Sequence, residues 1–410
     1  MSNTIILGAG VTGLCAGQGR RRPVYEGLES PGGLCASYYE RSYRFEKGGG
    51  HWIFGNDEDS LKVVNDLSVI KRYTRKASVY FPGSGTYVPY PFQNHLYLFP
   101  KAVRKKVEEE MRRPLDARAV TLHEWLGDNF GSTLCRLFFW PFHDLYTAGL
   151  SEKITPEDLF KNPCNRADIL RGLTKPTSPV GYNVTFAYPR QGLDHLMRQI
   201  EHYCDVRYHK RAVKIDMRGK KVFFEDGSEA VYKKLISTIP LSETVKLCGL
   251  DGIEADPYTS VLVFNIGARK GARCPEDHWV YVPSSQSGFH RVGFYSNVDA
   301  SFLPPAGCTK ELVSMYVEKA FLPGQKPDKI QLVRLGRDII AELKSWKYIG
   351  DVEVLSPTWI EHAYTWHRPG SKWKQEALSL LKEHDIHSIG RYGAWKFQGI
   401  LESMSDGWTS

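Results

Sequence analysis

Three glycines near the start of the chain, Gly8, Gly10 and Gly13, have the spacing of a phosphate-binding loop. They follow the apolar run Thr4–Leu7, and an acid, Glu26, ends the next short apolar stretch. In such a loop the first glycine allows a tight turn, the second lets a pyrophosphate approach the backbone, and the third lets helix and strand pack closely. The acid then accepts hydrogen bonds from a ribose. The chemistry that these residues predict is dinucleotide binding.

A second glycine pair, Gly32-Gly33, follows the acid, and the combination favours FAD as the dinucleotide. Only 18 positions separate Gly8 from Glu26, where about 20 residues are usual between the loop and the acid. The helix between them must therefore be short. It ends in a run of three arginines closed by Pro23, which is typical of a solvated helix cap, although a patch that binds polyanions remains an alternative.

The length, charge and cysteine pattern of the chain limit its class. With 410 residues the chain is too long for one compact core, and we expect two or three domains. The net charge of +8 favours an anionic small-molecule ligand and does not exclude nucleic acid. The eight cysteines form no CxxC pair, which predicts reduced thiols, a cytoplasmic protein and no metal site. No apolar run approaches 18 residues, so we expect no membrane association.

The pattern of apolar and polar residues predicts an α/β fold with a discontinuous, Rossmann-like FAD-binding domain. A buried strand at 235–240 is expected to return to the first sheet, and residues 401–407 are expected to form a short helix. A helical insertion and an antiparallel-sheet substrate domain complete the prediction. The expected limits are 1–77, 190–250 and 346–410 for the FAD-binding domain, 100–175 for the helical domain, and 78–99, 176–189 and 251–345 for the mixed-sheet substrate domain.

Several strings spread over most of the chain resemble UDP-galactopyranose mutases, especially the eukaryotic type, within the wider group of amine-oxidase-like FAD-dependent flavoproteins. The most specific string is Val-Pro-Tyr-Pro-Phe-Gln-Asn at 88–94. Shorter strings at 49–54, 279–283, 289–291 and 390–393 carry the same likeness. A homo-oligomer is expected by analogy with the family only.

The resemblance implies a mutase that interconverts the pyranose and furanose forms of a nucleotide-diphosphate sugar, UDP-galactose or a similar one. The family uses N5 of the reduced flavin for a redox-neutral ring contraction, and NAD(P)H is the reductant that this suggests. The chemistry belongs to the cofactor, while the protein orients the sugar and holds the leaving diphosphate, where negative charge develops.

The resemblance also assigns roles to single residues. The catalytic group that it implies is His51 beside the flavin, Arg291 on the diphosphate, and the assisting tyrosines Tyr281 and Tyr364. Besides the two glycine motifs and Glu26, the residues expected to contact FAD are Gly50, Val213, Arg391, Glu402 and Ser403, the last two in a segment closer to the terminal flavin helix of amine oxidases. Tyr90 and Gln93 match residues near the uridine.

Four positions of the implied nucleotide-sugar site depart from the family. Its second diphosphate arginine falls on Asn162, a tryptophan on Thr147, an asparagine on His143 and a tyrosine on Phe397. The loss of one charge-assisted contact typically costs about 1.5–3 kcal/mol of binding free energy. Either the ligand therefore differs from UDP-galactose, or Arg166 or Arg171 takes over the role of the missing arginine.

Two other functions remain open. The first is an FAD-dependent oxidase or dehydrogenase acting on a C–N or C–O bond of a nucleotide-linked or other anionic substrate, which suits the loss of diphosphate contacts. The second is a flavoprotein that binds a ligand without catalysis. A mutase works only with reduced flavin and consumes no oxygen, whereas substrate bleaches the flavin of an oxidase when oxygen is absent.

Overall fold

A five-stranded parallel sheet is assembled from segments that lie far apart in the sequence. The computed structural model describes residues 3–55, 57–115, 118–156, 163–181, 183–250, 252, 254–305 and 311–410. In spatial order the strands of this sheet are β10 (Val206–Arg207), β2 (Val24–Tyr25), β1 (Thr4–Leu7), β14 (Lys234–Ser237) and β20 (Ile386–Ser388). Leu235 pairs with Ile5 on one side and with Ile386 on the other. The predicted return of the chain to the first sheet near residue 235 is confirmed.

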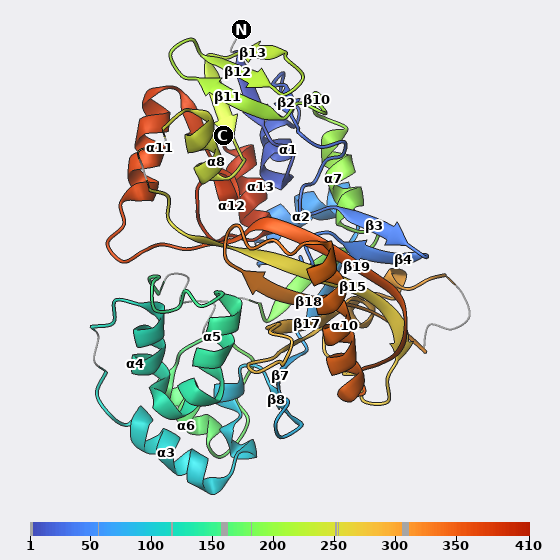
Figure 1. The fold of residues 1–410 in the computed structure, drawn as a ribbon, viewed down its shortest axis with the longest axis vertical. Coiled ribbons are helices and arrows are strands. Elements are labelled where there is room, and N and C mark those ends of the chain that lie inside the picture. The colour runs from blue at the N-terminus through green and yellow to red at the C-terminus, as the bar shows by residue number, and fades with distance from the viewer. Residues whose placement is uncertain are drawn as a thin grey trace.

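Helices cover this sheet, which explains why its strands are apolar and buried. Helix α1 (Val11–Gly17) follows the glycine loop and packs against α13 (Ile400–Trp408) and α7 (Leu193–Glu201) (Figure 1). The predicted terminal helix is thus α13. The remaining helices of this part are α2 (Glu58–Leu67), α8 (Leu241–Leu247), α11 (Trp373–Glu383) and α12 (Gly390–Gly393).

The arginine run after α1 holds the end of α13. Arg20 donates from Nη2 to the carbonyl oxygen of Trp408 at 2.5 Å, and Arg22 donates to that of Ser410 at 3.1 Å. The last carbonyls of a helix lack partners within the helix, and cationic donors satisfy them. Both arginines also donate to the carbonyl oxygen of Ala16 in the last turn of α1, at 3.4 Å. This arrangement confirms the helix-capping role over the polyanion patch, and it shows that the run caps α13 as well as α1.

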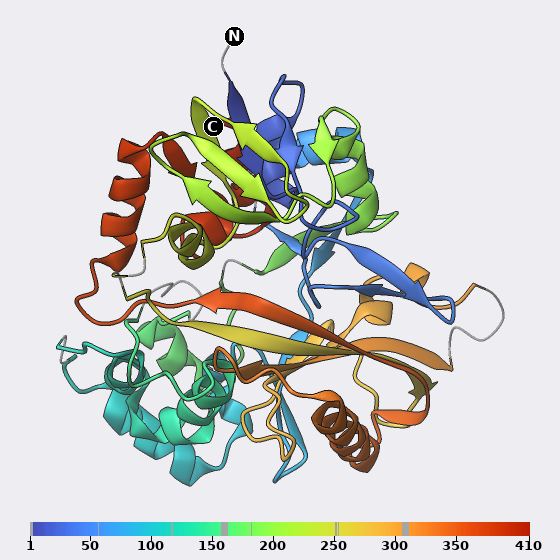
Figure 2. The ribbon, with the colours of Figure 1, turned by 45° about the horizontal axis from the view of Figure 1, so that its top comes forward.

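A seven-stranded sheet of mostly antiparallel strands forms the second layer (Figure 2). Its order is β19 (Ile349–Thr365), β15 (Tyr258–Lys270), β18 (Leu312–Phe321), β17 (Arg291–Phe294), β16 (Trp279–Tyr281), β7 (Ala77–Phe81) and β8 (Thr86–Pro89). Residues 349–365 were expected in the FAD-binding domain, and this assignment was wrong. They belong to the second sheet because β19 pairs with β15 along nearly its whole length.

Shorter sheets and helices lie between the two layers or cover their outer faces. One sheet has two strands, β3 (Ser37–Glu40) and β4 (Tyr43–Glu46). A three-stranded sheet has the order β5 (Ile53–Phe54), β9 (Thr185–Pro189) and β6 (Ile70–Thr74). A second three-stranded sheet has the order β11 (Ala212–Asp216), β12 (Lys221–Phe224) and β13 (Glu229–Val231). Helix α10 (Lys329–Ser345) packs on the face of the seven-stranded sheet opposite the parallel sheet, and α9 (Tyr295–Val298) follows β17.

A helical insertion lies beside the edge of the seven-stranded sheet (Figure 1). It comprises α3 (Lys101–Met111), α4 (Leu122–Leu134), a π-helical turn (Cys135–Phe139), α5 (Trp140–Tyr146) and α6 (Arg166–Gly172). Thr121 and Glu124 form a capping box that begins α4. The aromatic side chains of 138–142 form much of the insertion's own core. The parallel sheet, the insertion and the second sheet together confirm the predicted fold class.

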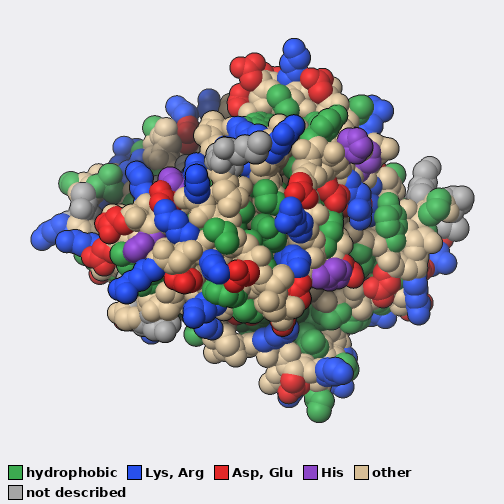
Figure 3. Space-filling view, turned by 90° about the horizontal axis from the view of Figure 1, so that it is seen from above, with side chains coloured by type: hydrophobic (Ala, Val, Ile, Leu, Met, Phe, Trp, Pro, Cys, Tyr) green, Lys and Arg blue, Asp and Glu red, His purple; other side chains and the backbone are tan. Residues whose placement is uncertain are grey.

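The face seen in Figure 3 has no large patch of only positive or only negative charge, because lysines and arginines lie among aspartates and glutamates. Along α3 two i,i+4 ion pairs form, Lys105 with Glu109 at 4.0 Å and Arg112, the residue after the helix, with Glu108 at 2.8 Å. No helix of the described residues is long and apolar enough to cross a membrane. The part of the chain that the structure describes also holds no cluster of three metal-ligating side chains.

Candidate active site

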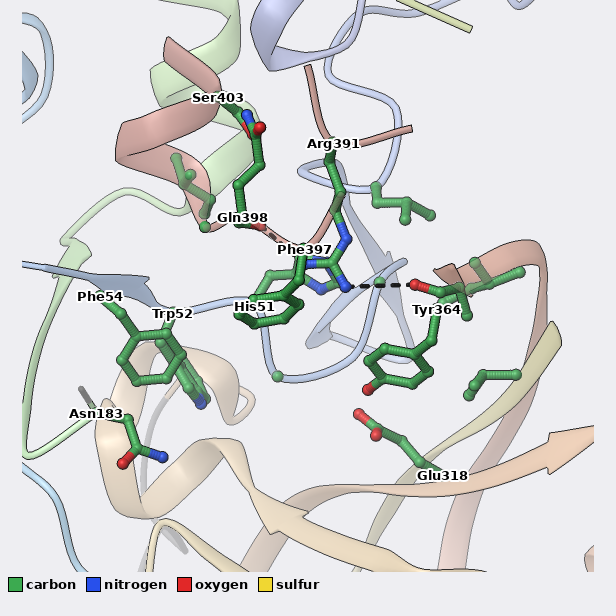
Figure 4. Close-up of a pocket in the computed structure, with 18 of the residues that line it drawn as sticks. His51, Trp52, Phe54, Asn183, Glu318, Tyr364, Arg391, Phe397, Gln398 and Ser403 are labelled. Atoms are coloured by element: carbon green, nitrogen blue, oxygen red, sulfur yellow. Dashed lines mark hydrogen bonds between the residues drawn. The ribbon is translucent and has the colours of Figure 1, made fainter. Parts of the chain in front are cut away.

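A cavity of about 740 Å³ lies where the parallel sheet, the seven-stranded sheet and the helical insertion meet. Its lining comes from the glycine loop, the segment 48–55, strands β16 to β18, the end of β19, helix α5 and the segment 391–403. Figure 4 shows side chains from these separate elements pointing into one space. The cavity therefore joins the predicted dinucleotide loop to the predicted catalytic residues.

The glycine loop has the backbone that a bound pyrophosphate requires. Gly8 has a φ of +93°, and a Cβ on Gly13 would lie 1.8 Å from the carbonyl oxygen of Gly8. A Cβ on Gly10 would meet no protein atom within 4 Å, because this position opens into the cavity. Gly32 and Gly33 line the same space, and Gly32 forms a β-bridge with Gly10. These five glycines leave a cradle that fits the pyrophosphate of FAD.

Three predicted cofactor residues lie outside the cavity lining. Gly13 lies behind the loop, where it allows the close contact of α1 with β1. Glu26 accepts hydrogen bonds from the backbone nitrogens of Ala9 (2.7 Å) and Leu28 (2.9 Å), so its carboxylate holds the loop in shape. Val213 lies on β11 with 49% of its surface exposed. Contacts of Glu26 and Val213 with FAD stay predictions.

The glycines before His51 let the chain lie against the second sheet. A Cβ on Gly50 would lie 1.9 Å from the hydroxyl oxygen of Tyr316, and one on Gly49 would lie 2.9 Å from Oε1 of Glu318. Gly50 and His51 then line the cavity. Burial, followed by the positive charge of Arg391, lowers the pKa of His51 to about 4, so the imidazole is neutral at neutral pH.

Arg291 lies in a row of side chains that crosses three adjacent strands. Tyr281 on β16 pairs with Arg291 on β17, which pairs with Glu318 on β18. Glu318 Oε2 accepts from Nε of Arg291 at 2.8 Å and from Nη2 at 2.5 Å, and Nη2 lies 3.5 Å from the hydroxyl oxygen of Tyr364. All four of these side chains line the cavity. The structure therefore brings the predicted catalytic arginine and both tyrosines together.

The Arg291–Glu318 pair is charged on both sides. Burial alone would lower the pKa of Arg291, but the Glu318 carboxylate raises it well above its usual value. Burial would raise the pKa of Glu318, but Arg291 and then His290 bring it down to about 2. Burial raises the pKa of Tyr364 to about 12, so its hydroxyl keeps its proton and can donate.

Arg391 organises the neighbouring part of the cavity wall, with its guanidinium 5.8 Å from the centroid of the Tyr364 ring. It donates from Nη1 to the carbonyl oxygen of Gln398 at 2.8 Å and from Nη2 to that of Ala363 at 3.4 Å. Its guanidinium lies over the ring of Phe397 at 4.7 Å from the centroid (Figure 4). The amide nitrogen of Gln398 donates to the hydroxyl of Ser403 at 2.9 Å. The side chains of this wall, with Glu402 at the start of α13, surround the space that the glycine cradle leaves for the flavin.

The rest of the cavity wall is aromatic. Tyr90 and Tyr281 lie with ring centroids 4.9 Å apart, and Gln93 is anchored by a 2.8 Å hydrogen bond from its Nε2 to the carbonyl oxygen of Pro163. Further lining comes from the helical insertion and the end of β19, through Phe138, Phe139, Phe142, His143, Tyr146 and Trp366. The predicted substrate residues Tyr90, Gln93, His143 and Phe397 therefore share this cavity with the catalytic group.

Thr147 is fully buried, does not line the cavity, and donates its hydroxyl to the carbonyl oxygen of His143 at 2.7 Å. Asn162 lies outside the described residues. Arg166 donates to backbone carbonyls at Arg113 and Asp128, and Arg171 pairs with Asp168 at the surface. Neither arginine lines the cavity and both have partners elsewhere, so the structure does not support the alternative in which one of them replaces the missing diphosphate arginine.

Sequence reasoning missed several residues that line the cavity, above all Glu318, His290, Gln398 and Asn183. Glu318 had a usable signal, because it is a lone acid within the apolar strand Leu312–Phe321. His290 stood within the string at 289–291 without a role of its own. Gln398 and Asn183 lie in loops, where no spacing marks them.

A family model described as flavin containing amine oxidoreductase matches residues 14–359. Among solved structures, reduced UDP-galactopyranose mutase is similar with a TM-score of 0.85 and 22% identity, over 100% of this chain and 94% of the other. Wild-type putrescine oxidase bound to putrescine is similar with a TM-score of 0.64 and 14% identity, over 100% of this chain and 97% of the other. A CLA-producing fatty acid isomerase from P. acnes is similar with a TM-score of 0.61 and 12% identity, over 100% of this chain and 97% of the other. At these identities the likeness shows a shared fold.

Proposed function

The chain belongs to the flavin-containing amine oxidoreductase family, and on that premise we propose that it is an FAD-dependent mutase. Its substrate would be a nucleotide-diphosphate sugar of the UDP-galactose type, converted between pyranose and furanose forms. The structure with a TM-score of 0.85 is that of a protein with this activity, which makes the substrate class a candidate. FAD, when bound and reduced, supplies the nucleophile for such a reaction.

One observation carries the proposal. Arg291, Tyr281 and Tyr364 converge on the same cavity that the glycine cradle enters. Arg291 uses Nε and Nη2 to hold Glu318, and Nη1 has no hydrogen-bond partner within the part of the chain that the structure describes. Its side chain keeps 22% exposure because that edge opens into the cavity. The arginine is thus positioned on one edge and available to an anionic ligand on the other.

The residues around Arg291 suit a leaving diphosphate. A guanidinium and a protonated phenol offer donors to phosphate oxygens on which charge grows as the glycosidic bond breaks. The strand pairing fixes Tyr281 beside Arg291 before any ligand binds, so little reorganisation is needed. The neutral imidazole of His51 lies on the flavin side and can hydrogen-bond a ring atom without adding charge. The buried aromatic wall excludes water from the reacting sugar.

The test measures interconversion of UDP-galactofuranose and UDP-galactopyranose by the purified flavoprotein, anaerobically reduced with dithionite or left oxidised. We expect conversion by the reduced form alone. Arg291→Lys should lower kcat/KM by roughly 10- to 100-fold, since a lysine cannot hold both Glu318 and a phosphate. Arg269→Lys, on the same sheet but at the surface beside Glu311, should leave the rate unchanged. Bound flavin without conversion would contradict the proposal.

The salt bridge between Arg291 and Glu318 also favours a second candidate function, that of an oxidase or dehydrogenase. Glu318 neutralises Arg291, and the surrounding wall is largely aromatic, which suits a substrate without a diphosphate. Such an enzyme would bleach its flavin when substrate is added in the absence of oxygen. Amines and alcohols would then be screened by the loss of the flavin absorbance band, a signal that a redox-neutral mutase does not give.

A further inference from the structure

The charges that line the cavity do not balance those of a diphosphate. Among the described residues the cationic side chains of the lining are Arg291 and Arg391. Arg391 is bound to carbonyl oxygens on the flavin side, and Arg291 is neutralised by Glu318. The two negative charges of a diphosphate diester would therefore meet a site that sums to zero beside Arg291. Burying such a ligand requires a further positive charge.

His290 lies where that charge can be placed. Its side chain is 1% exposed, it lines the cavity, and its Nε2 lies 3.6 Å from Oε2 of Glu318. This is the oxygen that holds Arg291. Neither ring nitrogen of His290 has a hydrogen-bond partner among the residues that the structure describes. The imidazole thus lies beside a carboxylate at a distance just beyond that of a hydrogen bond.

The surroundings of His290 keep it neutral before a ligand binds. Burial lowers the pKa of His290, and the positive charges of Arg291 and Lys319 act in the same direction, while Glu318 opposes them. The ring of Tyr146 on α5 lies 5.4 Å away and carries no charge at neutral pH. A dianion in the cavity would reverse this balance, because negative charge in a buried site favours the protonated imidazole.

The other two histidines of the lining are less suited. His51 lies near Arg391, which together with burial holds its pKa at about 4. His143 directs Nδ1 to the carbonyl oxygen of Phe139 at 2.7 Å, in the insertion. Only beside His290 does a carboxylate of the described lining stand ready to pair with the imidazolium that protonation creates.

We propose that His290 takes up a proton from solvent when a diphosphate binds, so that its imidazolium, paired with Glu318, supplies the second positive charge beside Arg291. The inference rests on the proposed function, since it takes the ligand to be a nucleotide-diphosphate sugar. It assigns to His290 the electrostatic role that a second arginine has in the mutases that the sequence resembles. The imidazolium acts at a distance, through the charge that it adds to the site.

Calorimetric titration of the oxidised flavoprotein with UDP-galactose at pH 7.5 tests the inference. The oxidised form should bind without turnover, and the diester phosphates of this ligand do not titrate near that pH. The binding enthalpy is measured in buffers of different ionisation enthalpy, and its slope counts the protons taken up. We expect roughly 0.5–1 proton per site in the wild type. In H290Q the slope should approach zero, with binding weaker by roughly 5- to 20-fold.

His278 supplies a matched control, since it is also buried, lies beside the same sheet, and does not line the cavity. H278Q should keep the wild-type slope. Binding without proton uptake by the wild type, or an unchanged slope in H290Q, would overturn the inference and leave the proposed function standing. No binding of UDP-galactose would overturn both. If H290Q does not fold, NMR titration of the wild-type histidine ring protons, with and without UDP-galactose, decides whether one histidine gains a proton.

Discussion

Arg291 and Glu318 face each other across β17 and β18, and both of their hydrogen bonds end on one oxygen, Oε2 of Glu318. Because the carboxylate is 3% exposed, the pair is held in a nearly dry site. The bond directions fix the guanidinium plane before a ligand arrives. The position of the charged group therefore depends on the strand register, which is set far from any substrate.

Glu318→Gln should destabilise the protein strongly, because it leaves the half-buried charge of Arg291 without its counter-charge. Loss of one partner of a buried pair typically costs about 3–5 kcal/mol of unfolding free energy. Urea unfolding of the flavin-loaded protein measures the change. Glu311→Gln, which breaks the exposed pair with Arg269 at 2.7 Å, should change the unfolding free energy by less than about 1 kcal/mol. Equal effects of the two substitutions would contradict this account.

The contribution of Glu318 should depend on pH. Its pKa of about 2 in the folded protein lies below the ordinary value of 4.5, so its stabilisation is complete above pH 4.5 and is lost as the pH falls towards 2. The difference in unfolding free energy between wild type and Glu318→Gln should thus be constant from pH 7 to 5 and shrink below pH 4.5. A difference that stays constant down to pH 3 would show that folding does not lower the pKa of this carboxylate, and one that grows in favour of the wild type as the pH falls from 7 to 5 would show that the carboxylate is protonated in the folded state.

Substitution of the second and third glycines of the first loop, Gly10 and Gly13, should have different effects. Gly10→Ala places a methyl group in open space within the cavity, so the protein should fold normally and lose FAD. Gly13→Ala drives a Cβ into the carbonyl oxygen of Gly8, so the fold itself should be destabilised. Flavin content and thermal unfolding of the apoprotein separate these effects. Gly83→Ala, in open space on the β7–β8 turn, should change neither.

Arg20→Ala should loosen the terminal helix, since Arg20 donates to the carbonyl oxygens of 407, 408 and 410. Loss of such charge-assisted hydrogen bonds should lower the unfolding free energy by about 1–3 kcal/mol. Flavin should be released at a lower temperature, because α13 carries Ser403 to the cavity. Arg21→Ala is the matched control, because Arg21 is exposed and no hydrogen bond of its side chain is described. If both variants release flavin at the same temperature, the hydrogen bonds of Arg20 to α13 do not help to hold the flavin.

Phe397→Tyr would add the hydroxyl that the resemblance to the mutases implies at this position. Phe397 lines the cavity, so we expect the added hydroxyl to be within reach of a ligand there. One new hydrogen bond is worth about 0.5–1.5 kcal/mol, and UDP-galactose should bind roughly 2- to 12-fold more tightly. Calorimetry measures the gain in affinity, and Tyr364→Phe, which removes a hydroxyl from the same cavity, should lower the affinity. Weaker binding by Phe397→Tyr would place the diphosphate elsewhere.

The glycine loop was predictable because each of its positions has a local backbone reason, such as the positive φ of Gly8. The strand near Leu235 was predictable as well, since a buried apolar run must find a covered sheet. The place of β19 was not, because partner choice is decided by tertiary pairing with β15. Glu318 is 27 positions from Arg291 in the sequence. Their contact depends on the register of two strands, which no local pattern specifies.

The central position of Leu235, between Ile5 and Ile386, has a consequence for how the molecule is made. Strand β1 emerges from the ribosome long before β14, and β20 emerges later still. Until residues 386–388 arrive, β14 keeps an unpaired edge, and until 400–408 arrive, α1 lacks its packing partner. Such long-range pairing folds slowly and leaves apolar surface exposed meanwhile. Flavin capture should therefore wait until residues 391–403 have been made, since these residues complete the wall of the cavity.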